Sequence, residues 1–287
     1  MTALSETPTI ELRDVRGPRA FGGPPRRFFH LLWTVSKTEL RTRYQGAVLG
    51  LLWSVLEPLL IFGVMYAVFS SITRFGGDIP HYPAMLLMGI MFYRALFSST
   101  TSRSVTCVVA RESLVRKTQF PRIIVPLSVV LTASLLFAGD VLVLLVFLFI
   151  NGVDPMWTWF LFPVIFLLFL ALTIGMSLLL SSLYVHFRDT LRIWSVVTLI
   201  LFYGSPIIFP VEAAPSGLRE ALFFANPFVP LLELARIWII DPSAPAITGL
   251  SSGPMSGLLI PGLVYLAGCT VGIWYFIRRA PKVAEEL

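Results

Sequence analysis

The chain has 287 residues, of which 56% are hydrophobic and only 13% are charged, against roughly 25% charged in an ordinary soluble domain. This balance excludes a soluble enzyme, a nucleic-acid-binding module and a disordered scaffold, because so much apolar surface needs a lipid environment. The net charge of +6 is typical of the basic cytoplasmic loops of a membrane protein. We therefore expect membrane lipids, and no nucleic acid, as partners.

The N-terminal region predicts a tail followed by an amphipathic helix. Residues 1–25 are polar and lack the apolar core of a signal peptide, so we expect a disordered cytoplasmic tail. Residues 26–45 predict a helix that lies in the membrane interface, although Glu39 falls on its apolar side. The alternative is a juxtamembrane leader that only obeys topology rules. The apolar face and the opposite cationic face consist of Phe28, Leu31, Leu32 and Val35, and of Arg26, Arg27, Lys37 and Arg41.

Six apolar segments predict membrane spans. A further stretch, about 215–243, is interrupted by Pro227 and Pro230, and each half is too short to cross. We expect two short re-entrant helices there; one extra pair of crossings is the alternative. The predicted fold is an all-α membrane protein, with the interfacial helix, six transmembrane helices and two re-entrant helices in one domain over 26–280, and a cytoplasmic tail over 281–287. The six spans cover about 47–72, 84–107, 123–150, 157–185, 191–211 and 256–277.

Basic residues orient the predicted spans. They concentrate before the first span, between the second and third, between the fourth and fifth, and after the sixth. The opposite loops hold only Arg74, Arg219 and Arg236. The positive-inside rule therefore predicts a multi-pass protein of the plasma (inner) membrane with both termini in the cytoplasm.

Motifs for catalysis are missing from the sequence. It contains no GxxxxGK[ST] phosphate loop, no HExxH and no GxSxG, so we expect no catalytic residue, no metal site and no nucleotide bound by this chain. Cys107 and Cys269 stand apart from other metal ligands and predict neither a disulfide nor a zinc site.

Few ionisable residues lie inside the predicted spans. Glu57 precedes Pro58 in the first span, and it either lines a watery conduit or pairs with Arg94 of the second. Asp140 lies in the middle of the third span, where we expect it to pack against a polar helix partner. Carboxylates do not recur at helical spacing, which argues against a proton relay.

Five short motifs occur in chain order at fixed places relative to the spans. They are RTRYQGAVLGLLW over 41–53, LVRKTQFPR over 114–122, FRD over 187–189, SPIIFP over 205–210 and NP over 226–227. Together they resemble the membrane subunits of type-2 ABC exporters, of the subgroup that moves lipid-linked polysaccharides or teichoic acids. The resemblance covers about residues 28–280. It implies a homodimer of this chain with two copies of a separate ATP-binding subunit, which holds ATP and Mg²⁺, and a conduit between the two copies lined largely by spans one and five.

A cytoplasmic loop over residues 107–122 is the predicted contact with the ATPase. A short helix here would move spans two and three when the ATPase closes; the alternative is that its cations only satisfy the positive-inside rule. Arg188 and Asp189 form either a second contact or a turn held by their own ion pair. The coupling candidates are Arg111, Glu112, Leu114, Arg116, Lys117 and Arg122.

Aromatic residues of spans one and five are candidates for the conduit wall. Sugar rings have apolar faces that stack on aromatic rings, and weak, similar contacts would let a glycan slide. Interfacial anchoring and helix packing are the alternative roles. Pro206 and Pro210 distort the end of span five, so residues 215–240 form either an outer gate or a surface cap. The candidates are Trp53, Phe62, Tyr66, Phe69, Phe202, Tyr203 and Phe209, with Tyr66 and Tyr203 preferred.

The substrate head group is expected near the end of the interfacial helix. Arg41, Arg43 and Tyr44 could hold a pyrophosphate, since arginine binds phosphate bidentately, although ordinary anionic lipid would suit them too. Arginine outnumbers lysine 19 to 3, which is typical of a GC-rich genome and makes a cell-wall galactan a candidate substrate. O-antigen polysaccharide and teichoic acid remain open. The rivals are an exporter of drugs or small lipids, and an intramembrane enzyme acting on polyprenyl-linked substrates.

Overall fold

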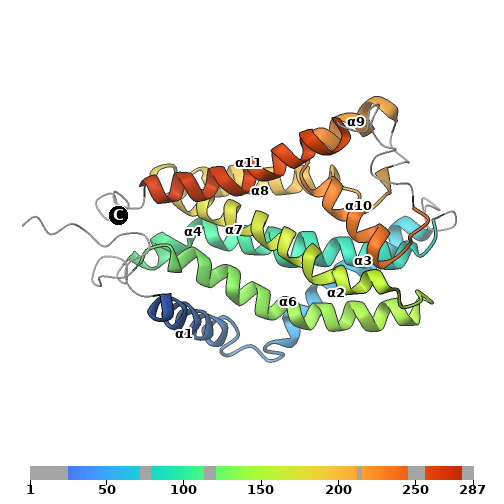
Figure 1. Ribbon diagram of the computed structural model, residues 1–287. Helices are drawn as coiled ribbons and strands as arrows, with labels where there is room; N and C mark the ends of the chain where they lie inside the picture. Colours follow the sequence, from blue (N-terminus) through green and yellow to red (C-terminus); the bar gives the residue numbers. More distant parts are fainter. Residues whose placement is uncertain (1–24, 72–78, 113–120, 212–214, 245–255, 280–287) are drawn as a thin grey trace, which may run out of the picture.

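A computed structural model describes residues 25–71, 79–112, 121–211, 215–244 and 256–279 of the chain. Every regular element in these ranges is a helix, and the long helices run side by side as a bundle (Figure 1). Five of them are long and apolar enough to cross a membrane. The predicted all-α membrane protein is therefore confirmed. The predicted tails, 1–25 and 281–287, lie outside the described residues except for Pro25.

Helix α1 (Pro25–Arg43) packs its apolar face against the protein. This face, which includes Phe28 and Leu32, covers a buried cluster contributed partly by α6 (Ile124–Ile150). Small polar side chains bring the two helices together, since Ser36 Oγ donates to the Ser128 carbonyl at 3.3 Å and Thr132 Oγ1 donates to the Ser36 carbonyl at 3.1 Å. The predicted amphipathic helix is present, with α6 beneath its apolar face.

The predicted first span begins later than its hydropathy indicates. Helix α2 runs from Leu52 to Ser71. Before it, Gly46 and Gly50 adopt positive φ angles of 83° and 50°, a region that favours glycine. Residues 44–51 are consequently a series of turns, and only the later part of the apolar segment is helical.

The other long spans lie close to their predicted positions. The second consists of α3 (Tyr82–Ile90), a π-helical segment η1 (Met91–Ser98) and α4 (Ser99–Ala110) in direct succession. Helix α6 forms the third. The fourth combines a short 3₁₀ turn, η2 (Trp157–Leu161), with α7 (Phe162–His186), and the last is α11 (Ser256–Arg279).

The fifth predicted span, 191–211, is the exception. Helix α8 covers only Thr190–Tyr203, and the following segment, which contains Pro206 and Pro210, is irregular. Proline removes a backbone donor and blocks the preceding turn, which explains the early end of the helix. Irregular backbone at membrane depth is tolerated where the protein buries it, and here the Tyr82 hydroxyl donates to the Ile208 carbonyl at 3.0 Å.

Two short helices lie between the fifth and sixth predicted spans, as expected. They are α9 (Ser216–Ala225) and α10 (Phe228–Ile239), separated at Asn226 and Pro227. Neither is long enough to cross a bilayer. The extra pair of crossings is therefore wrong.

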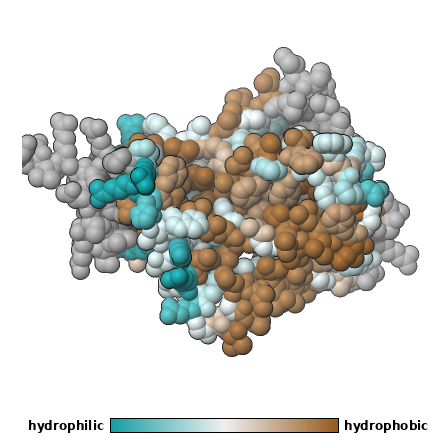
Figure 2. All heavy atoms as spheres, turned by 60° about the horizontal axis from the view of Figure 1, so that its bottom comes forward, coloured by the Kyte–Doolittle hydropathy of each residue, from teal (hydrophilic) through white to brown (hydrophobic). Residues whose placement is uncertain are grey.

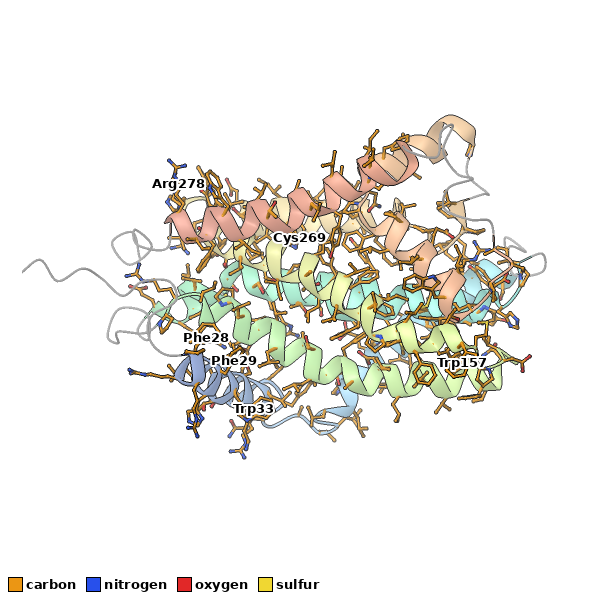
Figure 3. The ribbon with its side chains drawn as sticks, viewed as in Figure 1. Phe28, Phe29, Trp33, Trp157, Cys269 and Arg278 are labelled. Carbon is orange, nitrogen blue, oxygen red and sulfur yellow. The ribbon has the colours of Figure 1, made fainter. Side chains whose placement is uncertain are left out.

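Helices α7 and α11 cross at glycines. A Cβ on Gly175 would lie 2.7 Å from the backbone of Cys269, and one on Gly272 would overlap the carbonyl oxygen of Gly175. Small residues let membrane helices approach to backbone contact. The last span, α11, therefore packs directly on α7, near Cys269, which Figure 3 labels.

The two ends of the bundle differ in polarity. Phe28 of α1 and Arg278 of α11 lie at one end, and exposed Trp157 lies at the other (Figure 3). In Figure 2 the most hydrophilic atoms gather at the end where α1 lies, hydrophobic atoms dominate the middle of this face, and a smaller group of hydrophilic atoms lies at the opposite end. Trp33 and Trp157 are exposed, one toward each end of the bundle (Figure 3). Tryptophan is enriched at both membrane–water interfaces, and these positions fit that pattern.

Candidate functional site

Helix α2 is the most loosely held of the long helices. Among residues 52–70 only Pro58 is buried. Aromatic rings provide contacts between this helix and its neighbours. The ring of Phe62 lies 5.1 Å from that of Phe147 of α6, and the ring of Tyr66 lies 6.5 Å from that of Tyr82 of α3, measured between centroids. A seam lined by side chains therefore remains between α2 and the second span.

A polar cavity of about 240 Å³ occupies this seam. Its walls come from the end of α1, from α2, from η1 and α4, and from α6. Polar and apolar side chains contribute to the wall in similar measure, and the apolar ones include Pro58, Ile61 and Leu136. The polar lining consists of Arg43, Glu57, Arg94, Arg103 and Asp140, together with Ser54, Ser98, Ser99 and Ser102.

The cations of the cavity are not neutralised by ion pairs. Within the described residues, no carboxylate oxygen lies within 4.0 Å of the guanidinium of Arg43, Arg94 or Arg103. Glu57 and Arg94 face the same cavity without pairing, so the ion pair considered from the sequence is not formed. Burial, and to a lesser degree the like charge of Arg103, lower the pKa of Arg43, while Tyr44, Glu39 and Glu57 act in the opposite direction.

Asp140 is the most deeply buried charged residue of the cavity, with 2% of its surface exposed. Its Oδ1 has no hydrogen-bond partner among the described residues. The expected polar helix partner is therefore missing for this oxygen. A buried carboxylate oxygen requires a donor, and the cavity is the space from which a water or a ligand can supply one.

Two open grooves join the cavity at its arginines. A groove of about 660 Å³ is shared at Arg43 and Arg103, and it runs along α1 beside Thr34, Thr38 and Thr42. A second groove, of about 330 Å³, is shared at Ile61 and Arg94 and is otherwise apolar, with Leu60, Val64 and Met65 from α2. We call the cavity with its two grooves the α2 seam. The groove along α1, the cavity and the groove along α2 adjoin one another, with arginine at each junction.

The second span supplies a polar face to the seam. Arg94, Ser98 and Ser102 follow one another at four-residue intervals, as do Ser99 and Arg103, and residues with this spacing share a helix face. This spacing is the feature of the sequence that could have predicted the polar wall of the cavity. Arg103 belongs to it and was not among the predicted site residues. The π-helical turn of η1 begins three residues before Arg94; such turns occur frequently at functional sites.

The predicted coupling residues divide into three groups. Arg111 is tied into the protein, because it binds Glu39 of α1 at 2.8 Å and donates to Ser128 Oγ at 3.0 Å. This pair also explains why an acid lies on the apolar side of α1. Arg122 is buried, with 8% exposure, and Glu112 is half-buried. Leu114, Arg116 and Lys117 lie outside the described residues.

The predicted turn between α7 and α8 has no ion pair of its own. Arg188 stacks over the ring of Tyr184 at 5.1 Å, and within the described ranges the side chains of Arg188 and Asp189 form no salt bridge. The interpretation of FRD as a turn held by this pair is therefore wrong. Exposed Arg188 and Asp189 stay available for a contact with another chain.

The predicted conduit aromatics are not equivalent. Trp53, Tyr66 and Tyr203 are exposed, and Phe62 and Phe69 are half-buried. Phe209 shares a shallow groove of about 420 Å³ with Tyr203.

The prediction that Phe202 lines the conduit is not supported by its position. With 6% exposure it belongs to the core, where its ring lies 5.7 Å from Tyr93. Successive residues of a helix point in different directions, so Phe202 packs inward while Tyr203 is exposed. Phe202 therefore cannot line a conduit outside this chain.

Helix α8 is fixed to the second span and to α10. The Tyr93 hydroxyl donates to the Thr198 carbonyl at 2.6 Å, and Trp194 Nε1 donates to Thr101 Oγ1 at 3.1 Å. At its C-terminal end, Asn226 Nδ2 donates to the Gly204 carbonyl and to Ser205 Oγ, both at 2.9 Å. The NP motif thus clamps the end of α8 to the start of α10.

The predicted head-group residues lie at the entrance of the α2 seam. Arg43 is half-buried over the ring of Tyr44, at 5.3 Å, and lines both the cavity and the groove along α1. Arg41 is exposed and lines neither. The structure thus brings Arg43 and Tyr44 together and places Arg41 outside the seam.

Comparison with known proteins gives a consistent family. The family model described as ABC-2 type transporter matches residues 30–240. The O-antigen export system permease protein RfbA of Klebsiella pneumoniae is 32% identical over 212 residues, which cover 73% of this chain and 79% of the relative. Its namesake from Myxococcus xanthus is 30% identical over 203 residues, or 70% and 77% of the two chains. The polysialic acid transport protein KpsM of Escherichia coli is 26% identical over 199 residues, or 69% and 76%.

Proposed function

Because this chain belongs to the ABC-2 type transporter family, we propose that it is the membrane subunit of an ATP-driven exporter of a lipid-linked cell-surface polysaccharide. The relatives named above are permease proteins for O-antigen and polysialic acid. The observation that carries the proposal is the α2 seam, which gives an apolar helix bundle a central cavity lined by arginine and serine and two adjoining grooves that share its arginines. Such a path suits a ligand that is both polar and anionic.

The proposed complex contains two copies of this chain and two copies of an ATP-binding subunit. Members of this family are the membrane components of such exporters, and they are not enzymes by themselves. ATP and Mg²⁺ are bound by the partner subunit. The chain's own contribution is to hold the substrate and to change shape when the ATPase closes.

The cytoplasmic side of the proposed complex is the end of the bundle where α1 lies. Arg278 lies at this end (Figure 3), and the basic loops follow the positive-inside rule. Both termini are then cytoplasmic. The lipid-linked substrate would enter here, beside the groove along α1.

The coupling contact is proposed for the loop that joins the second and third spans. Arg116 and Lys117 are the cations of this loop that remain candidates for direct contact with the ATPase. Arg111 has a different role in this account: through Glu39 and Ser128 it links α1 to both spans. A force applied to the loop would therefore reach α1 and the seam together.

The conduit is proposed to form between the two copies, with exposed aromatic residues on its wall. Trp53 and Tyr66 of α2 and Tyr203 of α8 are the exposed members of the predicted set. Their rings can stack on sugar faces, and the tyrosine hydroxyls can donate to sugar oxygens. Weak, repeated contacts of this kind bind a glycan without trapping it.

Depletion of the chain tests the proposed function. We expect lipid-linked glycan to accumulate on the cytoplasmic face of the membrane, while the polysaccharide disappears from the cell surface. Analysis of extracted lipids before and after depletion measures the first effect, and a complementing copy of the wild-type chain is the control. The chemical structure of the accumulated glycan decides between galactan, O-antigen and teichoic acid. Unchanged lipid-linked glycan and unchanged surface polysaccharide would contradict the proposal.

A further inference from the structure

We propose that the α2 seam is a binding site for the phosphate group of a lipid, held first by Arg43 and Arg103 and then, farther along the seam, by Arg94. The inference rests on the proposed function for the identity of the cargo, and it names the group of the substrate that this chain recognises. It also assigns a role to the second span, which carries two of the three arginines.

The first argument is the absence of intramolecular neutralisation. A cationic side chain inside a membrane domain costs a few kcal/mol unless it meets water or a partner. Arg94 and Arg103 are exposed residues that line the seam, with no carboxylate of the described residues in ion-pair range. A phosphate is the partner that suits them, since guanidinium groups bind it through paired hydrogen bonds.

The second argument is the composition of the wall. Serine hydroxyls from α2, η1 and α4 surround the arginines and can donate to phosphate oxygens. Glu57 and Asp140 contribute the only carboxylates of the cavity's described lining, so three cations face two acids there and the formal excess is one positive charge. The groove along α1 adds Glu39 and Arg111, which pair with each other and leave this excess unchanged. A small excess favours an anion while keeping its release possible, as transport requires. The unpartnered Oδ1 of Asp140 offers an acceptor to a hydroxyl next to the phosphate.

The third argument selects a lipid over a free anion. The groove beyond Arg94 is apolar, with Leu60, Val64 and Met65 exposed or half-buried along α2. A hydrocarbon chain can lie against this surface while its phosphate reaches Arg94. The groove at the other end of the cavity is open and has a mostly apolar wall, in which threonine hydroxyls and the Glu39–Arg111 pair are the groups that can bind the polar part of the ligand. An inorganic anion would use the arginines and leave the apolar groove empty.

Binding to the purified complex tests the proposal. The permease and its ATP-binding subunit are placed in phosphatidylcholine nanodiscs and titrated with farnesyl pyrophosphate, with farnesol and with inorganic pyrophosphate. We expect farnesyl pyrophosphate to bind more tightly than either fragment. Loss of one charge-assisted contact in Arg103→Gln or in Arg94→Gln should weaken this binding by about tenfold or more.

Matched variants separate recognition from folding. Arg26→Gln removes an exposed cation of α1 that does not line the seam, and it should bind like the wild type. Arg103→Lys keeps the positive charge but lacks the paired donors of a guanidinium group. Its affinity for farnesyl pyrophosphate should lie between those of the wild type and Arg103→Gln. Melting temperatures without ligand identify any variant that is misfolded. Because Arg94 lies on a different turn from Arg103, each variant tests the site independently of the other.

The outcomes are distinct. Equal binding by wild type and both glutamine variants, or equal binding of farnesol, overturns the proposal. Equal binding of inorganic pyrophosphate overturns the lipid assignment and leaves a site for a free anion. Loss of binding in Arg103→Gln with unchanged polysaccharide export removes the seam from the transport path, while the proposed function stands. If depletion of the chain leaves export intact, the proposed function fails even where farnesyl pyrophosphate binds.

Discussion

Replacement of Asn226 by alanine should destabilise the C-terminal end of α8. Its side chain is buried and joins two elements: Nδ2 donates to the Gly204 carbonyl and to Ser205 Oγ at 2.9 Å, and Oδ1 accepts from the Phe228 amide at 3.0 Å. Alanine removes these three short bonds, together with a longer one from Nδ2 to the Leu201 carbonyl at 3.4 Å, and leaves the buried Phe228 amide without this acceptor. The helix then loses the contact that holds its end beside α10.

The expected loss follows from these bonds. At about 1 kcal/mol net for each hydrogen bond, Asn226→Ala should cost about 3 kcal/mol. A change of 1 kcal/mol shifts the melting temperature of a chain of this size class by about 2–4 °C, so the expected decrease is about 6–12 °C. Asn151 is a matched control, because its Nδ2 donates once, to the Phe147 carbonyl at 2.9 Å within the same helix end. Asn151→Ala should lower the melting temperature by about 4 °C or less.

Thermal melting of the detergent-purified complex, followed by tryptophan fluorescence, measures both variants. Asn226→Ala should also raise the reactivity of a cysteine placed at Ser205, which is buried in the wild type. A melting temperature equal to that of Asn151→Ala, together with unchanged cysteine reactivity, would refute the view that Asn226 clamps α8 to α10.

Three further predictions concern other parts of the molecule. Gly272→Val should lower the melting temperature, because its side chain would meet the Gly175 carbonyl and overpacking costs about 1–3 kcal/mol. A double-mutant cycle on Glu39→Gln and Arg111→Gln should give a coupling energy of about 1 kcal/mol, measured by denaturant unfolding, because the pair is partly exposed. A cysteine at Tyr203 should react with a membrane-impermeant maleimide in the assembled complex, since this side chain is 53% exposed in the single chain.

Two of these predictions have a control in the same element. Gly262→Val lies on α11 with nothing within 4 Å of the new Cβ, and it should melt like the wild type. A cysteine at Phe202 should stay unreactive, because that position is buried. Equal melting of the two glycine variants, equal reactivity of the two cysteines, or additive effects of the Glu39 and Arg111 substitutions would each contradict the corresponding structural statement.

Hydropathy and charge predicted most of the helices because the bilayer imposes length and composition on every span. They failed where an apolar sequence is not helical. Ile207 and Ile208 continue the hydropathy of α8, and yet Pro206 and Pro210 end the helix before them. An average over a window does not register the lost backbone donor of a proline. The break at Asn226, in contrast, was visible because polar residues and prolines coincide there.

The candidate site was only partly predictable. Arg94, Glu57 and Asp140 were conspicuous as ionisable residues inside apolar spans, which is a general signal of function. Their convergence on one cavity was not visible, since it depends on how α2, η1 and α6 pack. Likewise, Glu39 conflicted with the apolar face of α1 until Arg111, far away in the sequence, was found beside it. Contacts between distant segments carry no local sequence signature.

ATP-dependent transport in proteoliposomes tests the central claim most directly. The complex is reconstituted with its ATP-binding sites outward, together with lipid-linked glycan isolated from depleted cells, and a membrane-impermeant glycosidase reports how much glycan remains outside. The account predicts that ATP moves glycan into the lumen, where it is protected, and that Arg94→Gln and Arg103→Gln slow this protection. A complex that hydrolyses ATP and leaves the glycan fully accessible, in wild type and variants alike, would contradict it.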